Sequence, residues 1–235
     1  MAAASALSFL ANAARQLLGF ASARPLASAA LAVFALEFVT VTPGAYHARC
    51  LAMYLYEVYW RRARGRLGAI TVPLVERGLR VRHCDLDFNM HVNNSCYALE
   101  ADFSRFRWYL LFYSNGASPE GFARLAIAVG HVSTVFYKEM RWLLSFRTET
   151  RCIGFDEKWL FLETRFVSDR TGLHAVTTAR ICFKEKRGAE RGKTVPPAEA
   201  LAMLRFAVPE GFSKTPGAEV GALLARTATL LQQPQ

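Results

Sequence analysis

Residues 85–105, DLDFNMHVNNSCYALEADFSR, place a cluster of polar and reactive side chains directly before an apolar run. The first ten residues of this stretch contain two aspartates, three asparagines and one histidine. If the chain is extended here, side chains two residues apart share a face, so Asp87, Asn89 and His91 line one edge. Asp85 then faces the other way. A carboxylate, an amide and an imidazole on one edge can activate water or attack a carbonyl carbon. The pattern therefore indicates a hydrolytic centre, with Asp87, Asn89 and His91 as candidate catalytic residues.

The run that follows predicts one long, mostly enclosed helix over about residues 94–113. Its apolar side chains recur at helical spacing, and Asn115-Gly116 is a typical end signal. Asn93 or Asn94 is expected to cap the first turn. The free N–H groups and the positive end of the helix dipole then emerge beside the polar segment, where they could stabilise a developing oxyanion.

A structural interpretation of the same residues stays open. Asp and Asn before a helix are ordinary turn and cap residues, because their side chains accept hydrogen bonds from nearby backbone N–H groups. His91 could equally be a hydrogen-bonded core residue. Residue types alone do not separate the two interpretations.

Several further stretches have the apolar patterning of strands and are bounded by turn residues. They cover about residues 78–84, 125–140, 147–155, 158–168 and 172–186. The last two alternate clearly, with one face made of Leu160, Leu162, Thr164, Phe166, Ala175, Thr177, Ala179, Ile181 and Phe183. A short helix is expected near residues 197–206, opened by Pro196-Pro197. A single helix lying in the curve of an antiparallel sheet buries both, which predicts an α+β fold.

The N-terminal 66 residues differ in composition from the rest of the chain. Residues 1–36 contain no acid, and residues 26–42 form a run of 17 with Glu37 as its one charge. Residues 51–60 bring several aromatic rings directly before the arginines of residues 61–66. Aromatic rings followed by arginines are typical of a membrane interface. We expect membrane association through this segment, at the endoplasmic reticulum or the mitochondrion, while a cleaved targeting peptide and a soluble helical extension remain open.

Charge and cysteine content exclude several classes of function. The formal net charge is +10, and residues 1–66 hold seven Arg against two Glu. No basic recognition helix, zinc-finger spacing or RNA-binding aromatic signature is present, so nucleic acid is not an expected partner. The five cysteines are scattered and form no C-x-x-C pair, which argues against a disulfide framework and a zinc site. The anionic partners that remain are lipid headgroups and the phosphates of a carrier such as coenzyme A.

The segment from Asp85 to Tyr97 resembles the signature of hotdog-fold acyl thioesterases, in which an antiparallel sheet wraps around one long central helix. Those enzymes carry Asp-x-Asp, then His-Val-Asn-Asn, then a Tyr that opens the helix, as this chain does from Asp85 through His91 to Tyr97. In the 4-hydroxybenzoyl-CoA thioesterase branch the second Asp is the base or nucleophile, and it corresponds to Asp87. The plant acyl-carrier-protein thioesterases use an Asp, an Asn and a His that correspond to Asp87, Asn89 and His91.

The same comparison leaves one part of the plant mechanism without a counterpart. The Glu-Cys pair of the plant enzymes falls on Met140-Arg141, and Glu139 lies one position away. The acyl-carrier-protein mechanism is therefore incomplete here. The resemblance, over about residues 76–186, is closest to thioesterase superfamily member six proteins, which also have an N-terminal hydrophobic anchor.

This resemblance implies an acyl-CoA thioesterase of fatty acyl substrates that works as a homodimer and needs no metal or cofactor. It implies substrate contacts from Asn93, Asn94, Tyr97 and Tyr137. It divides the chain into a hydrophobic and basic segment at 1–66, a hotdog domain at 67–190 and a C-terminal helix and tail at 191–235.

Two alternatives to hydrolysis remain. The same pocket could bind acyl chains or lipid without turnover, tethered to a membrane. A hydratase of the same fold is the other alternative, because residues 87–91 weakly resemble the hydratase Asp-x-Asn-x-x-His, with a spacing one residue short.

Overall fold

The computed structural model describes residues 25–29, 42–60, 70–114, 124–204, 208 and 212. The chain divides into two compact units, residues 1–48 and 49–235. Within the first unit, residues 25–29 are helical and α3 (Ala45–Leu55) begins. The second unit contains the sheet, the long helix and all the candidate site residues.

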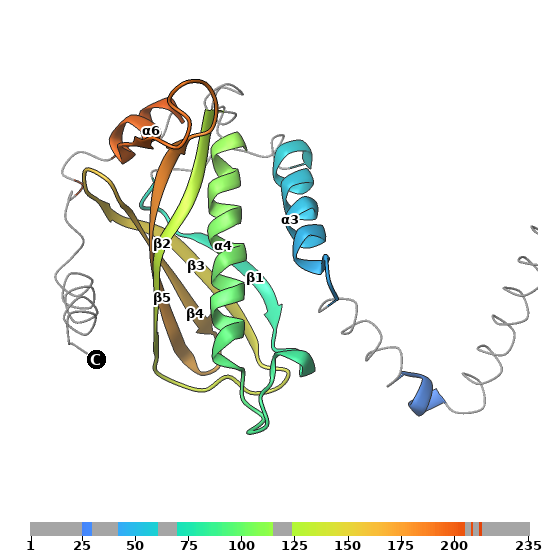
Figure 1. Ribbon diagram of the computed structural model, residues 1–235. Helices are drawn as coiled ribbons and strands as arrows, with labels where there is room; N and C mark the ends of the chain where they lie inside the picture. Colours follow the sequence, from blue (N-terminus) through green and yellow to red (C-terminus); the bar gives the residue numbers. More distant parts are fainter. Residues whose placement is uncertain are drawn as a thin grey trace, which may run out of the picture. The chain divides into compact units, whose positions relative to one another are not determined.

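The second unit is built on one antiparallel sheet. Its strands are β1 (Leu74–Arg80), β2 (Leu125–Phe136), β3 (Ser145–Phe155), β4 (Leu160–Ser168), β5 (Gly172–Glu185) and the short β6 (Thr194–Val195). The strand order is β1-β3-β4-β5-β2, and β6 pairs with β5. The long helix α4 (Asn94–Ser114) lies along one face of this sheet (Figure 1) and contacts β2, β3, β4 and β5. An antiparallel sheet around one central helix is the expected α+β hotdog arrangement, so the fold prediction is confirmed.

The core lies between α4 and the sheet face predicted from alternation. The nine side chains expected on the inner face of β4 and β5 are all buried. At the start of the helix, Tyr97 and Ala101 pack with Met140, Phe146 and Phe166 in one cluster. A second cluster, which includes Trp108 and Tyr109, fills the far end. The first cluster supports the polar segment that precedes the helix.

The predicted strand at 78–84 is wrong in its position. β1 ends at Arg80, and the 3₁₀ turn η3 (His83–Asp85) follows. The Asp85 carboxylate accepts hydrogen bonds from the Arg82 backbone N–H at 2.8 Å and from the Arg82 Nε at 3.1 Å. This capture of the backbone closes the turn and stops the strand.

The other elements lie near their predicted positions. The helix near 197–206 is α6 (Pro197–Met203), and β3, β4 and β5 begin and end within two residues of prediction. β2 ends at Phe136 rather than near residue 140, so residues 137–144 form a connection instead of a strand. This connection contributes to the site.

The segment Arg49–Trp60 is tied to α4 by ion pairs. The Arg49 guanidinium donates to both Glu100 carboxylate oxygens, at 2.6 and 2.7 Å. In the π-helical turn η1 (Tyr56–Trp60), the fully buried Glu57 accepts from Arg107 Nε at 2.7 Å. These contacts join residues 49–60 to the larger unit, whereas the predicted domain boundaries at 66 and 190 stay predictions.

Most of the predicted hydrophobic extension lies outside the described residues, as does the end signal Asn115-Gly116. Among the residues described, no helix combines the length and the apolar character needed to cross a membrane.

Candidate functional site

The polar segment before α4 is a tight turn rather than an extended strand. Leu86 and Val92 form an antiparallel bridge, so the chain reverses direction between them. The backbone closes the turn with Asp87 N–H donating to His91 O at 2.8 Å and Met90 N–H donating to Asp87 O at 3.0 Å. The expectation that Asp87, Asn89 and His91 line one extended edge is therefore wrong. Asn89 lies in the exposed tip of the turn.

The Asp87 carboxylate is held by its own loop. Its Oδ1 accepts hydrogen bonds from Asn89 N–H at 2.9 Å and from His91 N–H at 3.2 Å. Its Oδ2 has no donor among the residues that the structure describes. The loop thus fixes one carboxylate oxygen and leaves the other available, in a half-buried position, for a water molecule or a carbonyl carbon.

Asp85, the first aspartate of the pair, is a structural residue. In addition to its two bonds from the Arg82 backbone N–H and Nε, it accepts from Arg82 Nη2 at 2.6 Å. Its backbone carbonyl accepts from Asn93 N–H at 2.8 Å. The pKa of Arg82 is raised, and the largest cause is the hydrogen bond that its guanidinium donates to Asp85. Both ends of the loop are therefore anchored through Asp85.

Asn93, one of the two residues predicted to cap α4, is the helix cap. Its Oδ1 accepts from Ser95 N–H at 2.9 Å, and its backbone carbonyl accepts from Cys96 N–H at 2.9 Å. Asn94 is the first helical residue, and its N–H has no acceptor among the described residues. The start of α4 therefore presents one free backbone donor next to the Asp87 loop.

His91 is paired with a carboxylate that comes from the β2–β3 connection. His91 Nε2 lies in direct contact with a Glu139 carboxylate oxygen. The other Glu139 oxygen lies 3.6 Å from Arg141 Nη2. A backbone bridge between His91 and Arg141 and a 2.9 Å bond from Val92 N–H to Met140 O hold the two segments together. His91 and Glu139 are thus held in direct side-chain contact.

His174 positions the segment that carries Glu139. Its carbonyl oxygen accepts from Tyr137 N–H at 2.8 Å and from Lys138 N–H at 3.1 Å. Its Nδ1 lies 3.1 Å from Glu139 O, and its Nε2 lies 2.6 Å from Thr171 Oγ1. Because a carbonyl only accepts, Nδ1 carries the proton and Nε2 accepts from the threonine hydroxyl. The buried ring therefore ties the β4–β5 turn to the β2–β3 connection.

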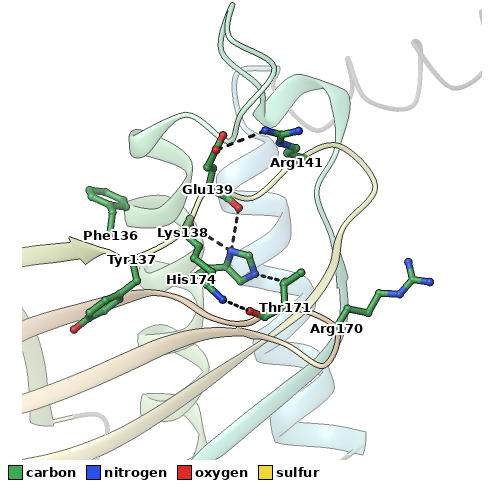
Figure 2. A pocket seen from close by; sticks show the side chains of 8 residues that line it. All are labelled: Phe136, Tyr137, Lys138, Glu139, Arg141, Arg170, Thr171 and His174. Carbon is green, nitrogen blue, oxygen red and sulfur yellow. Dashed lines mark hydrogen bonds and ion pairs between the residues drawn. The ribbon is translucent and has the colours of Figure 1, made fainter.

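An open cavity of about 790 Å³ lies over this junction. Figure 2 shows Phe136 and Tyr137 on one side of it and Arg170 on the other, with His174 between them. The full lining is Phe136, Tyr137, Lys138, Glu139, Arg141, Arg170, Thr171 and His174. The predicted residue Tyr137 thus lies at a cavity, and the residue is 59% exposed.

Tyr97 lies in the core. Its ring is 3% exposed and meets the rings of Phe136 and Phe166 edge to face, each at 5.2 Å between centroids. Burial raises the pKa of its hydroxyl, and a hydrogen bond that its oxygen accepts from the Met140 backbone opposes that shift. The internal void beside it measures about 10 Å³, enough for about one water. Its role in substrate binding stays a prediction.

Sequence reasoning missed two residues of this site, Glu139 and His174. Glu139 lies one position from the place where the plant enzymes carry their glutamate, and that proximity was the one available signal. His174 is an isolated histidine on a strand, so nothing in its local sequence indicates a role.

Comparison with known proteins places this site in a family context. The family model described as the thioesterase-like superfamily matches residues 81–205. The thioesterase lcsJ of Purpureocillium lilacinum is 31% identical over 109 residues, 39% of this chain and 35% of that protein. Protein THEM6 of Danio rerio is 31% identical over 106 residues, 44% of this chain and 49% of that protein. The chain therefore matches about a third to a half of the length of these relatives.

Solved structures were found as well. The YbaW probable thioesterase of Escherichia coli has 14% identity and a TM-score of 0.44, covering 57% of this chain and 96% of that one. The gentisyl-coenzyme A thioesterase BH1999 has 14% identity and a TM-score of 0.44, covering 56% of this chain and 99% of that one.

Proposed function

The chain belongs to the thioesterase-like superfamily, and we propose that it hydrolyses acyl-CoA thioesters with Asp87 as the catalytic carboxylate. The observation that carries this proposal is the asymmetry of the Asp87 side chain. One oxygen accepts two backbone N–H bonds, and the other is free among the described residues. A carboxylate fixed in this way can act on a substrate without first reorganising.

In the proposed reaction, Asp87 Oδ2 takes a proton from water as the water oxygen attacks the thioester carbonyl carbon. The free Asn94 N–H and the positive end of the α4 dipole stabilise the oxyanion. The carbon–sulfur bond then breaks, and the acyl group leaves as a carboxylic acid. Asp87 releases its proton to solvent and the proton donor of the thiolate is recharged from solvent, after the thiolate has taken its proton from that donor. We assign that last proton transfer to His91, because Glu139 fixes its ring. Direct attack by Asp87 on the carbonyl carbon is the covalent variant of the same chemistry.

We place the nucleotide part of coenzyme A in the cavity. Lys138 and Arg170 supply cations for its phosphates, and the exposed Tyr137 ring offers a stacking surface for its base. Arg170 is well suited to this role, since its guanidinium has no partner among the described residues. The predicted substrate contacts of Asn93 and Asn94 are consistent with their position at the start of the helix.

The test is an assay of the purified full chain against acyl-CoAs of graded chain length and against acyl-N-acetylcysteamine, which lacks the nucleotide. We expect Asp87→Asn to lower kcat by about 10²–10⁴-fold, the usual contribution of a general base. Glu157→Gln, an exposed acid in the β3–β4 turn, is the matched control. Lys138→Ala with Arg170→Ala should raise KM for acyl-CoA and leave the truncated substrate unaffected. Turnover that survives Asp87→Asn would overturn the assignment.

A non-catalytic, membrane-tethered acyl-chain or lipid binder is the second candidate. The observation in its favour is that two backbone bonds to Asp87 Oδ1 are also what an ordinary turn residue makes. Absence of turnover with every acyl-CoA, together with saturable binding of the same ligands by calorimetry, would favour this candidate.

We also propose a homodimer formed along β2. This strand is at the edge of the sheet, and it carries the exposed apolar residues Val129, Val132 and Phe136. An edge of this kind pairs readily with another strand. Dissociation to monomer on Val132→Lys, measured by sedimentation in detergent, is the expected result.

Membrane association through the N-terminal segment remains part of the proposal. Leu51, Leu55 and Tyr59 are exposed and recur every four residues along α3 and η1, on the side away from Arg49 and Glu57. Whether the membrane is that of the endoplasmic reticulum or the mitochondrion is testable by imaging the tagged full chain in cells.

A further inference from the structure

Four large apolar side chains are exposed at the end of the domain that carries the Asp87 loop. Phe88 is 94% exposed, Met90 53%, Trp142 52% and Leu143 55%. None belongs to the catalytic mechanism proposed above. We call these four residues the apolar rim. Large apolar side chains gathered at one exposed place usually mark an interaction surface.

The rim residues come from two loops that lie side by side. His91 bridges Arg141 in antiparallel fashion, so the next residues along, Met90 and Trp142, face each other. The second loop is also fixed from its other side, because Leu143 N–H donates to Val81 O at 3.1 Å. Both loops lie beyond the same end of the sheet, at the lower end of the domain in Figure 1. The four rim residues therefore come from two adjoining loops at one end of the sheet.

The backbone is strained at two of the four positions. Met90 has φ 62° and Leu143 has φ 61°, and they are the non-glycine residues with positive φ in the described part of the chain. This region is unfavourable for bulky side chains and is usually occupied by Gly or Asn. Met90 and Leu143 are therefore bulky and exposed at positions where a smaller residue would be less strained.

Cations flank the rim. Arg141 lies in the second loop directly before Trp142, its side chain is 73% exposed, and its Nη2 lies 3.6 Å from a Glu139 carboxylate oxygen. Arg80 is exposed at the end of β1, and its strand partner Ser145 follows shortly after Leu143. No acid pairs with Arg80 among the described residues. Apolar tips between arginines are the pattern of a surface that inserts at the headgroup level of an anionic bilayer.

We propose that the apolar rim docks on an anionic lipid surface, with Phe88, Met90, Trp142 and Leu143 at the acyl boundary and Arg80 and Arg141 on the headgroups. This contact is separate from the N-terminal segment and does not depend on the hydrolysis proposed above. It would bring the Asp87 loop within a few ångströms of acyl chains in the bilayer.

A second copy of the chain is a less suitable occupant. A symmetric dimer contact brings the same patch of each copy together, so the arginines of both copies would be gathered in one contact. Like charges in an apolar contact are unfavourable, whereas the chain's net charge of +10 favours an anionic surface.

The experiment measures quenching of tryptophan fluorescence by brominated lipids, with the full chain reconstituted in vesicles of phosphatidylcholine and phosphatidylserine. Trp142→Phe isolates the contribution of the rim, and Trp159→Phe is the matched control because that ring packs over Gly130 on the sheet. We expect Trp142→Phe to remove a quenched component and Trp159→Phe to leave it. Removing either arginine should raise the phosphatidylserine content needed for half-maximal quenching of that component by about fivefold.

Two results would overturn the proposal. One is a quenched fraction that stays the same in Trp142→Phe. The other is conversion of a dimer to a monomer in detergent by Phe88→Ser with Leu143→Ser, which would assign the rim to a second copy. Because Phe88, Trp142 and Leu143 are exposed and Trp159→Phe keeps an aromatic ring at a half-buried position, circular dichroism should report an unchanged fold. Fluorescence quenching does not require catalytic turnover, so it tests lipid docking even if the hydrolysis assay shows no activity.

Discussion

Asp85→Asn should destabilise the protein, whereas Asp87→Asn should not, although the two aspartates are two residues apart. Asp85 accepts three bonds from Arg82, at 2.6, 2.8 and 3.1 Å, and its side chain is 13% exposed. Hydrogen bonds to charged groups contribute about 1.5–3 kcal/mol each. Asparagine keeps one acceptor oxygen and Arg82 remains partly solvated, so we expect a net loss of about 2 kcal/mol.

For a domain of this size, that loss corresponds to a fall in Tm of about 4–8 °C. Asparagine at 87 keeps the Oδ1 that accepts the Asn89 and His91 N–H groups, so we expect a change below about 0.5 kcal/mol there. Guanidinium unfolding measures both, with the midpoint shifting and the slope unchanged. Equal stability of Asp85→Asn and the natural chain would refute the structural role of Asp85, and a larger loss for Asp87→Asn would reverse the assignment of the two residues.

Three further predictions concern parts of the structure away from the site. Gly130→Ala should lower the free energy of unfolding, measured by thermal melting, by about 1–3 kcal/mol, because an added Cβ would lie 2.3 Å from the Trp159 ring. At Gly188 an added Cβ meets no neighbouring atom, so Gly188→Ala tests backbone strain alone. Cys152 should resist alkylation of the folded protein at pH 8, since burial raises its thiol pKa to about 12 and leaves about one thiolate in 10⁴; modification at the rate of an exposed thiol would contradict this. The Arg124 guanidinium lowers the pKa of Glu185, so the stability from this pair is present above the ordinary Glu pKa and is lost as pH falls through the lowered value. Arg124→Ala should therefore flatten the acid side of the curve of stability against pH. An unchanged curve would contradict the pairing.

The fold could be predicted from the sequence because its elements are long and strongly patterned. The alternation of residues 160–166 and 175–183 assigned the inner face of β4 and β5 correctly, since a strand has a side-chain period of two. The helix was placed by the spacing of its apolar residues, and its observed bounds, Asn94–Ser114, agree. These signals are local, so one sequence contains them in full.

The site was harder to predict because its geometry depends on hydrogen bonds that pattern does not encode. The extended arrangement of residues 87–91 failed since the Asp87 carboxylate captures backbone N–H groups two and four residues later. Glu139 reaches His91 only because β2 ends at Phe136 and the chain then crosses to the loop. No local signal in a single sequence gives such a crossing.

The two aspartates differ in what surrounds them, and that difference explains why one motif contains both. The Asp85 carboxylate accepts hydrogen bonds from Arg82, and the Asp85 carbonyl accepts one from the N–H of the helix cap Asn93. Asp85 therefore fixes both ends of the loop. Asp87 lies inside that loop and is held through one oxygen alone. The loop therefore holds the inner carboxylate in place while one of its oxygens stays free among the described residues. The residue with more bonds therefore supports structure, and the residue with fewer is the one left for chemistry.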